Sequence, residues 1–349
     1  MQVVNIVDHL DQVNFGIWNA ALATANPLKE KYDVDSILVS RRSDWTNPGY
    51  QLAATHLFDA PTKAARDELA ESLRPGWNST IVVTHGAWRF PTRWGAYFRE
   101  QGIPWIYVPH GMLEPWSLEH KRFRKKFYLS LFERPLARRA DVIRAVGRPE
   151  WENLRALFGD QAPCRLIPNG IPPIAADLSE KDYARKQILF MGRLHEKKCV
   201  ARLVDAFLAS RLANDPGYEL LVAGPDQGEL AAIRRSLAER PADNVQVLGP
   251  VFGEEKEQLL RRCCFFTLPS QSEGFPTSVV EAMGYGCYPL ISAGCNFPEA
   301  DQAGLCEMTS VATDDIACSL ERLADVNDDA LRDLQAQCIV FINAPSTTE

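Results

Sequence analysis

Two glutamates near the end of the chain have the chemistry needed to bind hydroxyl groups. Glu273 lies in a polar loop after the apolar run 264–268, and Glu281 follows eight residues later among apolar side chains. The apolar run predicts a buried strand. A carboxylate in apolar surroundings is costly to bury unless a polar partner contacts it. The two glutamates therefore predict carboxylates that accept hydrogen bonds from ligand hydroxyls.

The residues between the two glutamates predict the start of a helix. Pro276 is followed by Thr277 and Ser278, which is a typical helix opening. A helix N-terminus offers free N–H groups and the positive end of the helix dipole, which suit a phosphate. Pro276 has no N–H, so the amides would come from the next two residues. A phosphate beside hydroxyl-binding carboxylates describes a nucleotide-sugar; the alternative is acidic residues that only complement the helix dipole.

The segment 273–283 resembles the signature of the retaining family-4 glycosyltransferases of GT-B fold (glycosyl transferases group 1) that build surface polysaccharides or glycolipids. The resemblance rests on the spacing of the glutamates, on Gly274-Phe275-Pro276 and on Ala282-Met283. It implies that Glu273 contacts the transferred sugar as a catalytic residue. The implied donor-binding residues are Gly274, Phe275, Thr277, Ser278, Glu281 and, in the loop before the first helix, Gly16, where the family usually has two glycines.

Two basic residues lie between a predicted strand and a predicted helix. The strand 187–194 contains Arg193, and Lys198 precedes the amphipathic stretch 199–207. Two fixed cations there could neutralise a diphosphate leaving group, although alone they would usually be surface charge. The Gly-Arg-Leu…Lys-Gly motif of the resembled family implies this catalytic role for both. The chain has Cys199 in place of the last glycine, which predicts an altered start of the helix.

Two His-Gly pairs follow predicted strands in the first half of the chain, at His85 and His110. Ligands of parallel sheets bind beyond the carboxyl ends of the strands. For His85 we put a structural role first. The segment 109–116 resembles a loop of family members that build surface polysaccharides. It implies that His110 lies close to the transferred sugar, as a hydrogen-bond partner or as a stabiliser of leaving-group charge, and not as a nucleophile.

The stretch 117–140 is strongly basic within an acidic protein, with eight Lys or Arg against two Glu. Aromatic residues and leucines interleave with the charges at helical spacing, which predicts an amphipathic basic helix. One interpretation is a solvated face over a core stripe. The other is docking on an anionic membrane surface that presents a lipid-linked acceptor.

The composition of the 349 residues is that of a globular protein, with 46% hydrophobic and 24% charged residues. The net charge of −7 disfavours nucleic acid as a partner. No apolar run approaches the roughly 20 residues that span a bilayer, and no basic leader predicts a signal peptide. Nine cysteines without a CxxC pair predict free thiols in a reducing cytosol. We therefore expect a cytoplasmic protein, with peripheral contact to the inner membrane face if the basic helix docks.

Strands and helices alternate through both halves, which predicts an α/β protein with parallel sheets. With the resemblance, the expected architecture is GT-B: two doubly wound, Rossmann-like domains facing a central cleft. We place the acceptor-side domain at 1–168, a hinge at 169–186 that begins within a Pro-Asn-Gly segment, and the nucleotide-sugar-binding domain at 187–349. The closing helix 331–342 is followed by the polar tail 344–349, which predicts either a short closing helix or an absent crossover.

The resemblance implies a retaining hexosyltransferase. It would move a hexose from a UDP- or GDP-sugar to a hydroxyl of a glycan or lipid-linked acceptor. It implies no metal and no cofactor, because the nucleotide-sugar is a substrate and the protein supplies the positive charge. Two alternatives stay open: a nucleotide-sugar 2-epimerase and a non-catalytic nucleotide-sugar-binding protein. An epimerase would need acid and base carboxylates in the first domain, and the sequence identifies no such set.

Overall fold

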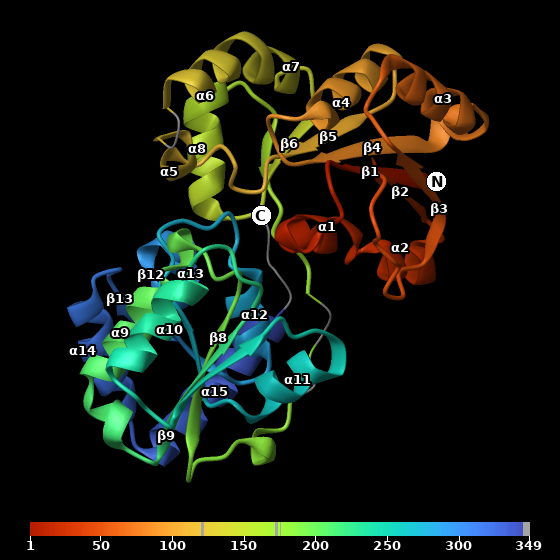
Figure 1. The fold of residues 1–349 in the computed structure, drawn as a ribbon. Helices are drawn as coiled ribbons and strands as arrows, with labels where there is room; N and C mark the ends of the chain where they lie inside the picture. The colour runs from red at the N-terminus through yellow and green to blue at the C-terminus, as the bar shows by residue number, and fades with distance from the viewer. Residues whose placement is uncertain (120–121, 172–173, 175, 345–349) are drawn as a thin grey trace. The chain divides into compact units, whose positions relative to one another are not determined.

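The computed structural model describes residues 1–119, 122–171, 174 and 176–344. The chain forms two compact units, Met1–Gly170 and Ile171–Glu349, shown in Figure 1. The boundary falls directly after the Pro-Asn-Gly segment. Arg144 fixes the end of the first unit, because its guanidinium donates to the carbonyls of Ile167 and Pro168 at 2.8 Å each.

The first unit is built on a seven-stranded sheet in the order β3-β2-β1-β4-β5-β6-β7, and every pair is parallel. This order reverses direction at β1, so the carboxyl ends of β1 and β4 meet where ligands of doubly wound sheets bind. The strands are β1 (Gln2–Val7), β2 (Asp35–Arg41), β3 (Leu52–Phe58), β4 (Thr80–His85), β5 (Trp105–Val108), β6 (Val142–Ala145) and β7 (Cys164–Leu166).

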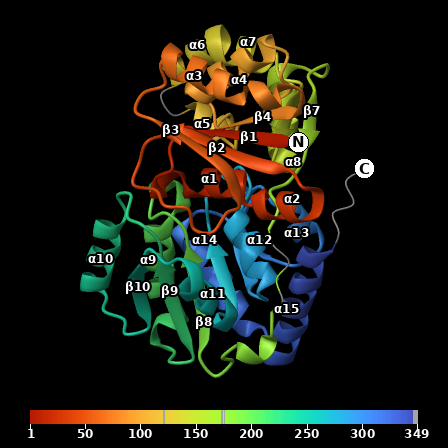
Figure 2. The ribbon, with the colours of Figure 1, turned by 90° about the vertical axis from the view of Figure 1, so that its right-hand side faces the viewer.

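Helices cover both faces of this sheet, as Figure 2 shows. Two apolar clusters result. The larger contains Trp94 and Trp105, and the smaller packs Trp18 and Leu22 of α1 against the other face. The helices are α1 (Phe15–Leu22), α2 (Ala25–Tyr32), α3 (Lys63–Leu73), α4 (Phe90–Glu100), α5 (Pro115–Glu119), α6 (Arg122–Tyr128), α7 (Arg134–Ala137) and α8 (Arg148–Phe158).

The second unit contains a six-stranded parallel sheet in the order β10-β9-β8-β11-β12-β13. Parallel strands covered on both faces are expected to be apolar throughout, and every residue of β9 is buried. The strands are β8 (Lys186–Met191), β9 (Tyr218–Ala223), β10 (Val245–Gly249), β11 (Phe265–Leu268), β12 (Tyr288–Ser292) and β13 (Glu307–Thr309).

Three helices, α9, α10 and α14, lie on one face of this sheet, and α11, α12 and α15 lie on the other (Figures 1 and 2). The closing helix α15 packs against α12 and is sixteen residues long, so the expected closing helix is not a short one. The helices are α9 (Val200–Ala209), α10 (Leu230–Glu239), α11 (Gly253–Arg262), α12 (Thr277–Gly284), α13 (Pro298–Gln302), α14 (Thr313–Asp325) and α15 (Asp328–Asn343). The two parallel-sheet units confirm the predicted α/β fold.

Most of the basic stretch 117–140 is one continuous helical segment, 122–137, which contains a π-helical turn. The described part of the stretch consists of α5, α6, the π-helical turn at Leu129–Glu133 and α7. The turn ends directly before Arg134-Pro135, where the missing N–H of proline interrupts the regular helix ladder. It also turns Glu133 inward, where the carboxylate accepts hydrogen bonds from Thr92 and Tyr107. Residues 120 and 121 of this stretch lie outside the described residues.

Candidate functional site

The loop after β8 brings the two predicted cations toward the start of α9. Arg193 is the second residue after the strand, and its guanidinium donates to Gln227 Oε1 at 3.2 Å. Lys198 ends a 3₁₀ turn, Glu196–Lys198, and the next residue, Cys199, adopts a left-handed conformation with φ +53°. A positive φ at this position explains why a glycine would serve here. Cys199 adopts the left-handed backbone conformation that a glycine would adopt there. The predicted alteration at the start of α9 therefore consists only of the cysteine side chain.

Lys198 and Glu273 form the centre of this site. Lys198 Nζ lies 2.5 Å from Glu273 Oε1, and both side chains are almost covered, with exposed fractions of 13% and 12%. Burial alone would raise the pKa of Glu273, but the charges of Lys198 and Lys197 outweigh it and hold the pKa below its ordinary value. Glu273 is therefore a carboxylate that accepts hydrogen bonds and does not act as an acid near neutral pH.

Backbone bonds hold the loop that carries Glu273 from both sides. On one side, the carbonyl of Lys197 accepts from the Gln271 N–H at 2.8 Å. On the other, the Glu273 N–H donates to Gly294 O at 2.7 Å, and the Asn296 amide donates to Glu273 O. A Cβ on Gly294 would stand 2.3 Å from Ser270 O, so only glycine permits this close approach of two backbones. The sequence interpretation missed Gly294 and Asn296.

The loop leads into α12 as the sequence predicted, with Thr277 as the first helical residue. The Thr277 N–H already donates to the Phe275 carbonyl at 2.9 Å. Within the described residues, the Ser278 N–H makes no such bond. Ser278 is thus the better placed of the two predicted amides, while Thr277 would first have to give up its own bond. The Phe275 ring stands edge-on to Phe297, with ring centroids 6.3 Å apart.

Glu281, on α12, pairs with a residue that the sequence interpretation missed. Lys256 on α11 donates to Glu281 Oε1 at 2.6 Å, and about a quarter of each side chain is exposed. The carboxylate thus has the polar partner that burial in an apolar helix demands. No signal in the sequence marks Lys256, which lies 25 residues from its partner.

His110 lies in the first unit, at the carboxyl end of β5. Its Nε2 atom is 2.9 Å from Nδ1 of His85, and Nε2 of His85 is 3.1 Å from Oδ1 of Asn5. Burial lowers the pKa of His110 to about 3, with a smaller contribution from Arg144. Both rings are neutral, because burial also lowers the pKa of His85 well below its usual value. His85 is the direct hydrogen-bond partner of His110, and its structural role stays a prediction.

The buried carboxyl group of Glu150 holds the backbone turn at His110 and Gly111 in place. The backbone is left-handed at His110 (φ +53°) and at Gly111 (φ +71°). Glu150 accepts hydrogen bonds from the Gly111 N–H at 2.5 Å and from the Val146 N–H at 2.8 Å. Burial raises the pKa of Glu150 to about 7, partly offset by these two bonds. The sequence interpretation missed Glu150, since an acidic residue in the first turn of α8 is expected at any helix start.

Gly16 occupies the second position of α1 and not the preceding loop. A Cβ at this position would contact nothing within 4 Å, and its φ is not in the left-handed region. The backbone therefore does not require a glycine there. A donor-binding role for Gly16 stays a prediction.

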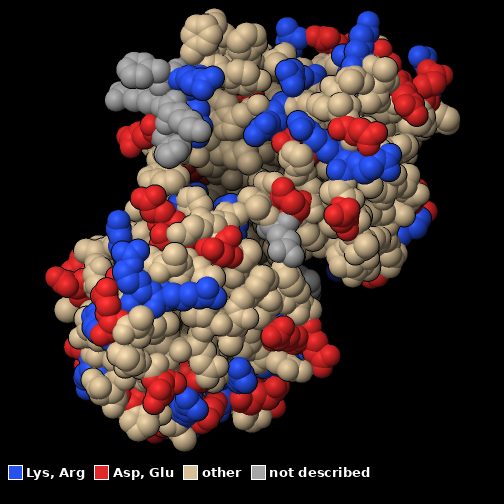
Figure 3. All heavy atoms as spheres, viewed as in Figure 1, with Lys and Arg blue, Asp and Glu red and all other residues tan. Residues whose placement is uncertain are grey.

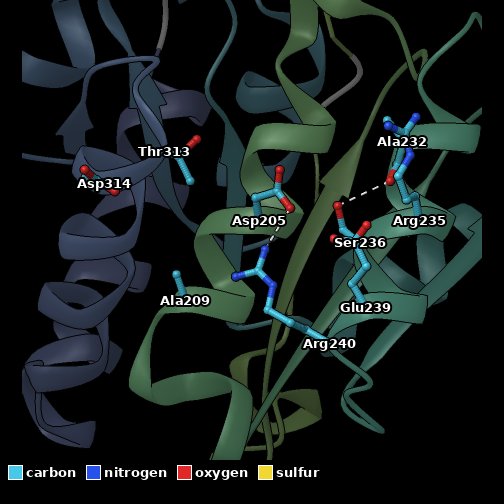
Figure 4. A pocket seen from close by; sticks show the side chains of 9 residues that line it. All are labelled: Asp205, Ala209, Ala232, Arg235, Ser236, Glu239, Arg240, Thr313 and Asp314. Carbon is cyan, nitrogen blue, oxygen red and sulfur yellow. Dashed lines mark hydrogen bonds and ion pairs between the residues drawn. The ribbon is translucent and has the colours of Figure 1, made fainter.

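A surface hollow of about 590 Å³ lies between α9, α10 and α14 (Figure 4). An ion pair between Asp205 and Arg240, 3.0 Å apart, crosses it. None of the residues that line it is a predicted site residue. They are Asp205, Ala209, Ala232, Arg235, Ser236, Glu239, Arg240, Thr313 and Asp314. The described residues also contain no cluster of His, Cys, Asp and Glu that could hold a metal ion.

Two protein families match the sequence, one in each unit. Residues 16–170 match the glycosyl transferase 4-like domain, and residues 177–337 match the glycosyl transferases group 1. No curated protein matches the chain.

Solved structures match over nearly the full length, at low sequence identity. HepE from Anabaena, solved in complex with UDP and glucose, has 16% identity and a TM-score of 0.72 over 98% of this chain and 97% of its own. Sucrose-phosphate synthase from Thermosynechococcus elongatus has 19% identity and a TM-score of 0.71 over 99% and 94%. WaaG, a glycosyltransferase of lipopolysaccharide biosynthesis, has 12% identity and a TM-score of 0.69 over 99% and 96%.

Proposed function

Because the chain belongs to the glycosyl transferases group 1 and has the GT-B fold, we propose that it is a retaining hexosyltransferase acting from a UDP- or GDP-sugar. The acceptor in this proposal is a hydroxyl of a glycan or of a lipid-linked sugar. The observation that carries it is the Lys198–Glu273 pair, held by the loop that opens α12. The complex of HepE with UDP and glucose supports a nucleotide-sugar donor for this fold.

In the proposed reaction, the sugar–diphosphate bond breaks while positive charge grows on the sugar and negative charge on the diphosphate. Lys198, Arg193 and the Ser278 amide would stabilise the leaving diphosphate. Glu273 would accept a hydrogen bond from a sugar hydroxyl, as a carboxylate with a lowered pKa can do. Glu281 would accept from the ribose hydroxyls. The leaving oxygen would take the acceptor proton on the same face, which retains the anomeric configuration.

The test is incubation of the full chain with UDP-hexoses and GDP-hexoses, with and without glycan and lipid-linked acceptors. Release of nucleoside diphosphate together with a glycoside of unchanged anomeric configuration is the expected result. An inverted anomer would contradict the retaining mechanism. A changed free nucleotide-sugar would indicate the epimerase, and a thermal shift without turnover would indicate a binding protein.

We extend the proposal to an anionic membrane surface as the place of the acceptor. Phe127, Leu131 and Phe132 are 66%, 53% and 50% exposed, so they do not form the core stripe of the alternative interpretation. Leu129 and Ala137 face inward in their place. Figure 3 shows uncharged atoms on the outside of the first unit where α6 and α7 lie, with Lys or Arg side chains close by. Among the described helices, none has both the length and the apolar character to span a bilayer.

Exposed aromatic and basic side chains together suit the interface of an anionic bilayer, where each basic residue adds on the order of 1 kcal/mol. The test is co-sedimentation with vesicles of phosphatidylcholine alone or with phosphatidylglycerol. We expect binding only with the anionic lipid, and weaker binding of the Phe127→Ser/Leu131→Ser double variant. A matched double variant at the exposed residues Tyr32 and Val340 should bind as the wild type does. Equal sedimentation with both vesicle types would refute the docking.

A further inference from the structure

Three polar side chains form one hydrogen-bonded line at the carboxyl end of the first sheet. Asn5 lies in β1, His85 ends the adjacent β4, and His110 follows β5. Asn5 Oδ1 is 3.1 Å from His85 Nε2, and His85 Nδ1 is 2.9 Å from His110 Nε2. The two rings are inclined by only 26°, which suits a hydrogen bond in the plane of both rings. Asn5 and His85 are 5% and 3% exposed, so water does not compete for these contacts.

The direction of the hydrogen bonds in this line follows from the number of protons available. An amide oxygen can only accept, so His85 Nε2 donates its proton to Asn5. A neutral imidazole has a single N–H, which leaves His85 Nδ1 as an acceptor. His110 Nε2 must then carry a proton and donate it to His85. His110 Nδ1 is left with a lone pair.

The line keeps this arrangement because neither ring is charged. The local titratable groups are the guanidinium of Arg144 and the carboxyl group of Glu150, which accepts from the Gly111 N–H. Arg144 disfavours a further positive charge on either ring, in addition to their burial. His110 is thus offered to the solvent or a ligand as one fixed tautomer.

We propose that His85 is a positioning residue for glycosyl transfer, which with Asn5 fixes His110 as an acceptor of a hydrogen bond from a hydroxyl of the transferred sugar. The inference rests on the proposed function and deepens it. Of the two roles open to His110, it selects the hydrogen bond to the sugar. A neutral ring whose only proton is given to His85 has none to donate to a leaving oxygen.

The first test needs no variant. Two-dimensional ¹H–¹⁵N spectra of the ¹⁵N-histidine-labelled full chain report which ring nitrogen carries the proton. We expect the Nε2–H tautomer for His110 in the wild type and a mixture of tautomers in Asn5→Leu. A wild-type His110 protonated at Nδ1, or charged at pH 7, would overturn the proposal whether or not the protein transfers sugar.

The second test uses turnover of whichever nucleotide-sugar the chain accepts. His85→Phe keeps the ring but removes both nitrogens, and kcat should fall about tenfold while the KM for the donor changes less than twofold. His85→Asn places an acceptor oxygen near the former Nδ1 and should recover kcat to within about threefold of the wild type. His56→Phe, on β3, is the control and should leave kcat unchanged.

The outcomes separate the two proposals. Full kcat in His85→Phe, or a His85→Asn variant as slow as His85→Phe, would overturn the positioning role. The expected tautomer in a wild type that transfers no sugar from any donor would leave the hydrogen-bonded line intact and overturn the proposed function. Thermal unfolding of each variant identifies any that has merely lost its fold.

Discussion

The ammonium group of Lys198 is bonded to the carboxylate of Glu273 across 75 residues of sequence. The pair lies almost out of solvent, so each charge is compensated mainly by the other, and Glu273 also by the nearby charge of Lys197. Each residue therefore has two roles: each keeps its partner ionised, and each is available to a bound donor. Substitutions at this pair should affect both stability and turnover.

We predict that Lys198→Met is destabilised by about 3 kcal/mol at pH 7, because Glu273 is left buried without its cation. The folded pKa of Glu273 is lowered, so its contribution to stability is present above about pH 4.5 and is lost as the pH falls through the folded pKa. The wild type should therefore lose stability below pH 4.5. In Lys198→Met the pKa of Glu273 is higher, because its cation is gone. This variant should therefore lose less free energy of unfolding over the same pH range, as urea unfolding measures it.

The double variant Lys198→Met/Glu273→Gln controls for the charge, and it should recover part of the stability that Lys198→Met loses at pH 7. Turnover of Lys198→Met should fall at least tenfold if the ammonium stabilises the leaving diphosphate. The surface variant Lys63→Met should keep the wild-type rate. A near-normal rate in Lys198→Met would remove this residue from the mechanism.

The prediction for Glu281 concerns donor binding. A ribose hydroxyl donates more strongly to a carboxylate than to an amide. Glu281→Gln should therefore raise the Kd of the nucleoside diphosphate about tenfold, which corresponds to about 1.4 kcal/mol. Isothermal titration with UDP and GDP measures it. Lys256→Met, which removes the partner of Glu281 but not the carboxylate, should change the Kd less than threefold; an unchanged Kd in Glu281→Gln would contradict the ribose contact.

The sequence predicted the elements that carry strong local signals. The apolar runs of β4, β5, β8 and β11 and the start of α12 at Pro276-Thr277 stand where they were expected. The strand β3 was missed, because Leu52–Phe58 contains no fully buried residue and includes a histidine and two alanines. The strand β13 has only three residues, too few for any periodicity.

The pairings within the site could not be predicted, because they join residues from different elements. Lys256 meets Glu281, and His85 meets His110, only once the parallel strands have brought their ends together. The burial of Lys181 could not be predicted from the sequence either. It lies in the segment 169–186, which reads as a linker, yet it is 6% exposed and donates to the carbonyls of Leu260 and Cys263 at 3.0 and 2.6 Å. A lysine in a polar segment carries no sign of such burial.

Glu150 gives a prediction on the pH dependence of stability. Its folded pKa of about 7 lies above the unfolded value of 4.5, so its contribution is fully present below pH 4.5 and is lost as the pH rises through 7. The difference of 7 − 4.5 = 2.5 pH units corresponds to on the order of 3 kcal/mol. The free energy of unfolding of Glu150→Gln, measured relative to the wild type, should therefore rise by about that amount between pH 4.5 and pH 8.

Glu152→Gln is the matched control, because Glu152 is exposed on the same helix. Its difference from the wild type should stay constant over this range. The free energy of unfolding of Glu150→Gln could instead run parallel to that of the wild type across this pH range. That result would show that Glu150 is ionised throughout, and that the bonds from Gly111 and Val146 outweigh its burial.

The last prediction concerns the backbone strain at Cys199. A residue with a Cβ pays roughly 1–2 kcal/mol in the left-handed region, and glycine does not. Cys199→Gly and Cys199→Ala both remove the buried thiol, so their difference in unfolding free energy reports the left-handed backbone, which favours glycine, and the burial of one methyl group, which favours alanine. We expect the glycine variant to be the more stable by up to about 1 kcal/mol. At Ala201, inside α9, glycine should instead be about 1 kcal/mol less stable than alanine. If alanine were the better residue at both positions, the left-handed turn that presents Lys198 would not exist in solution.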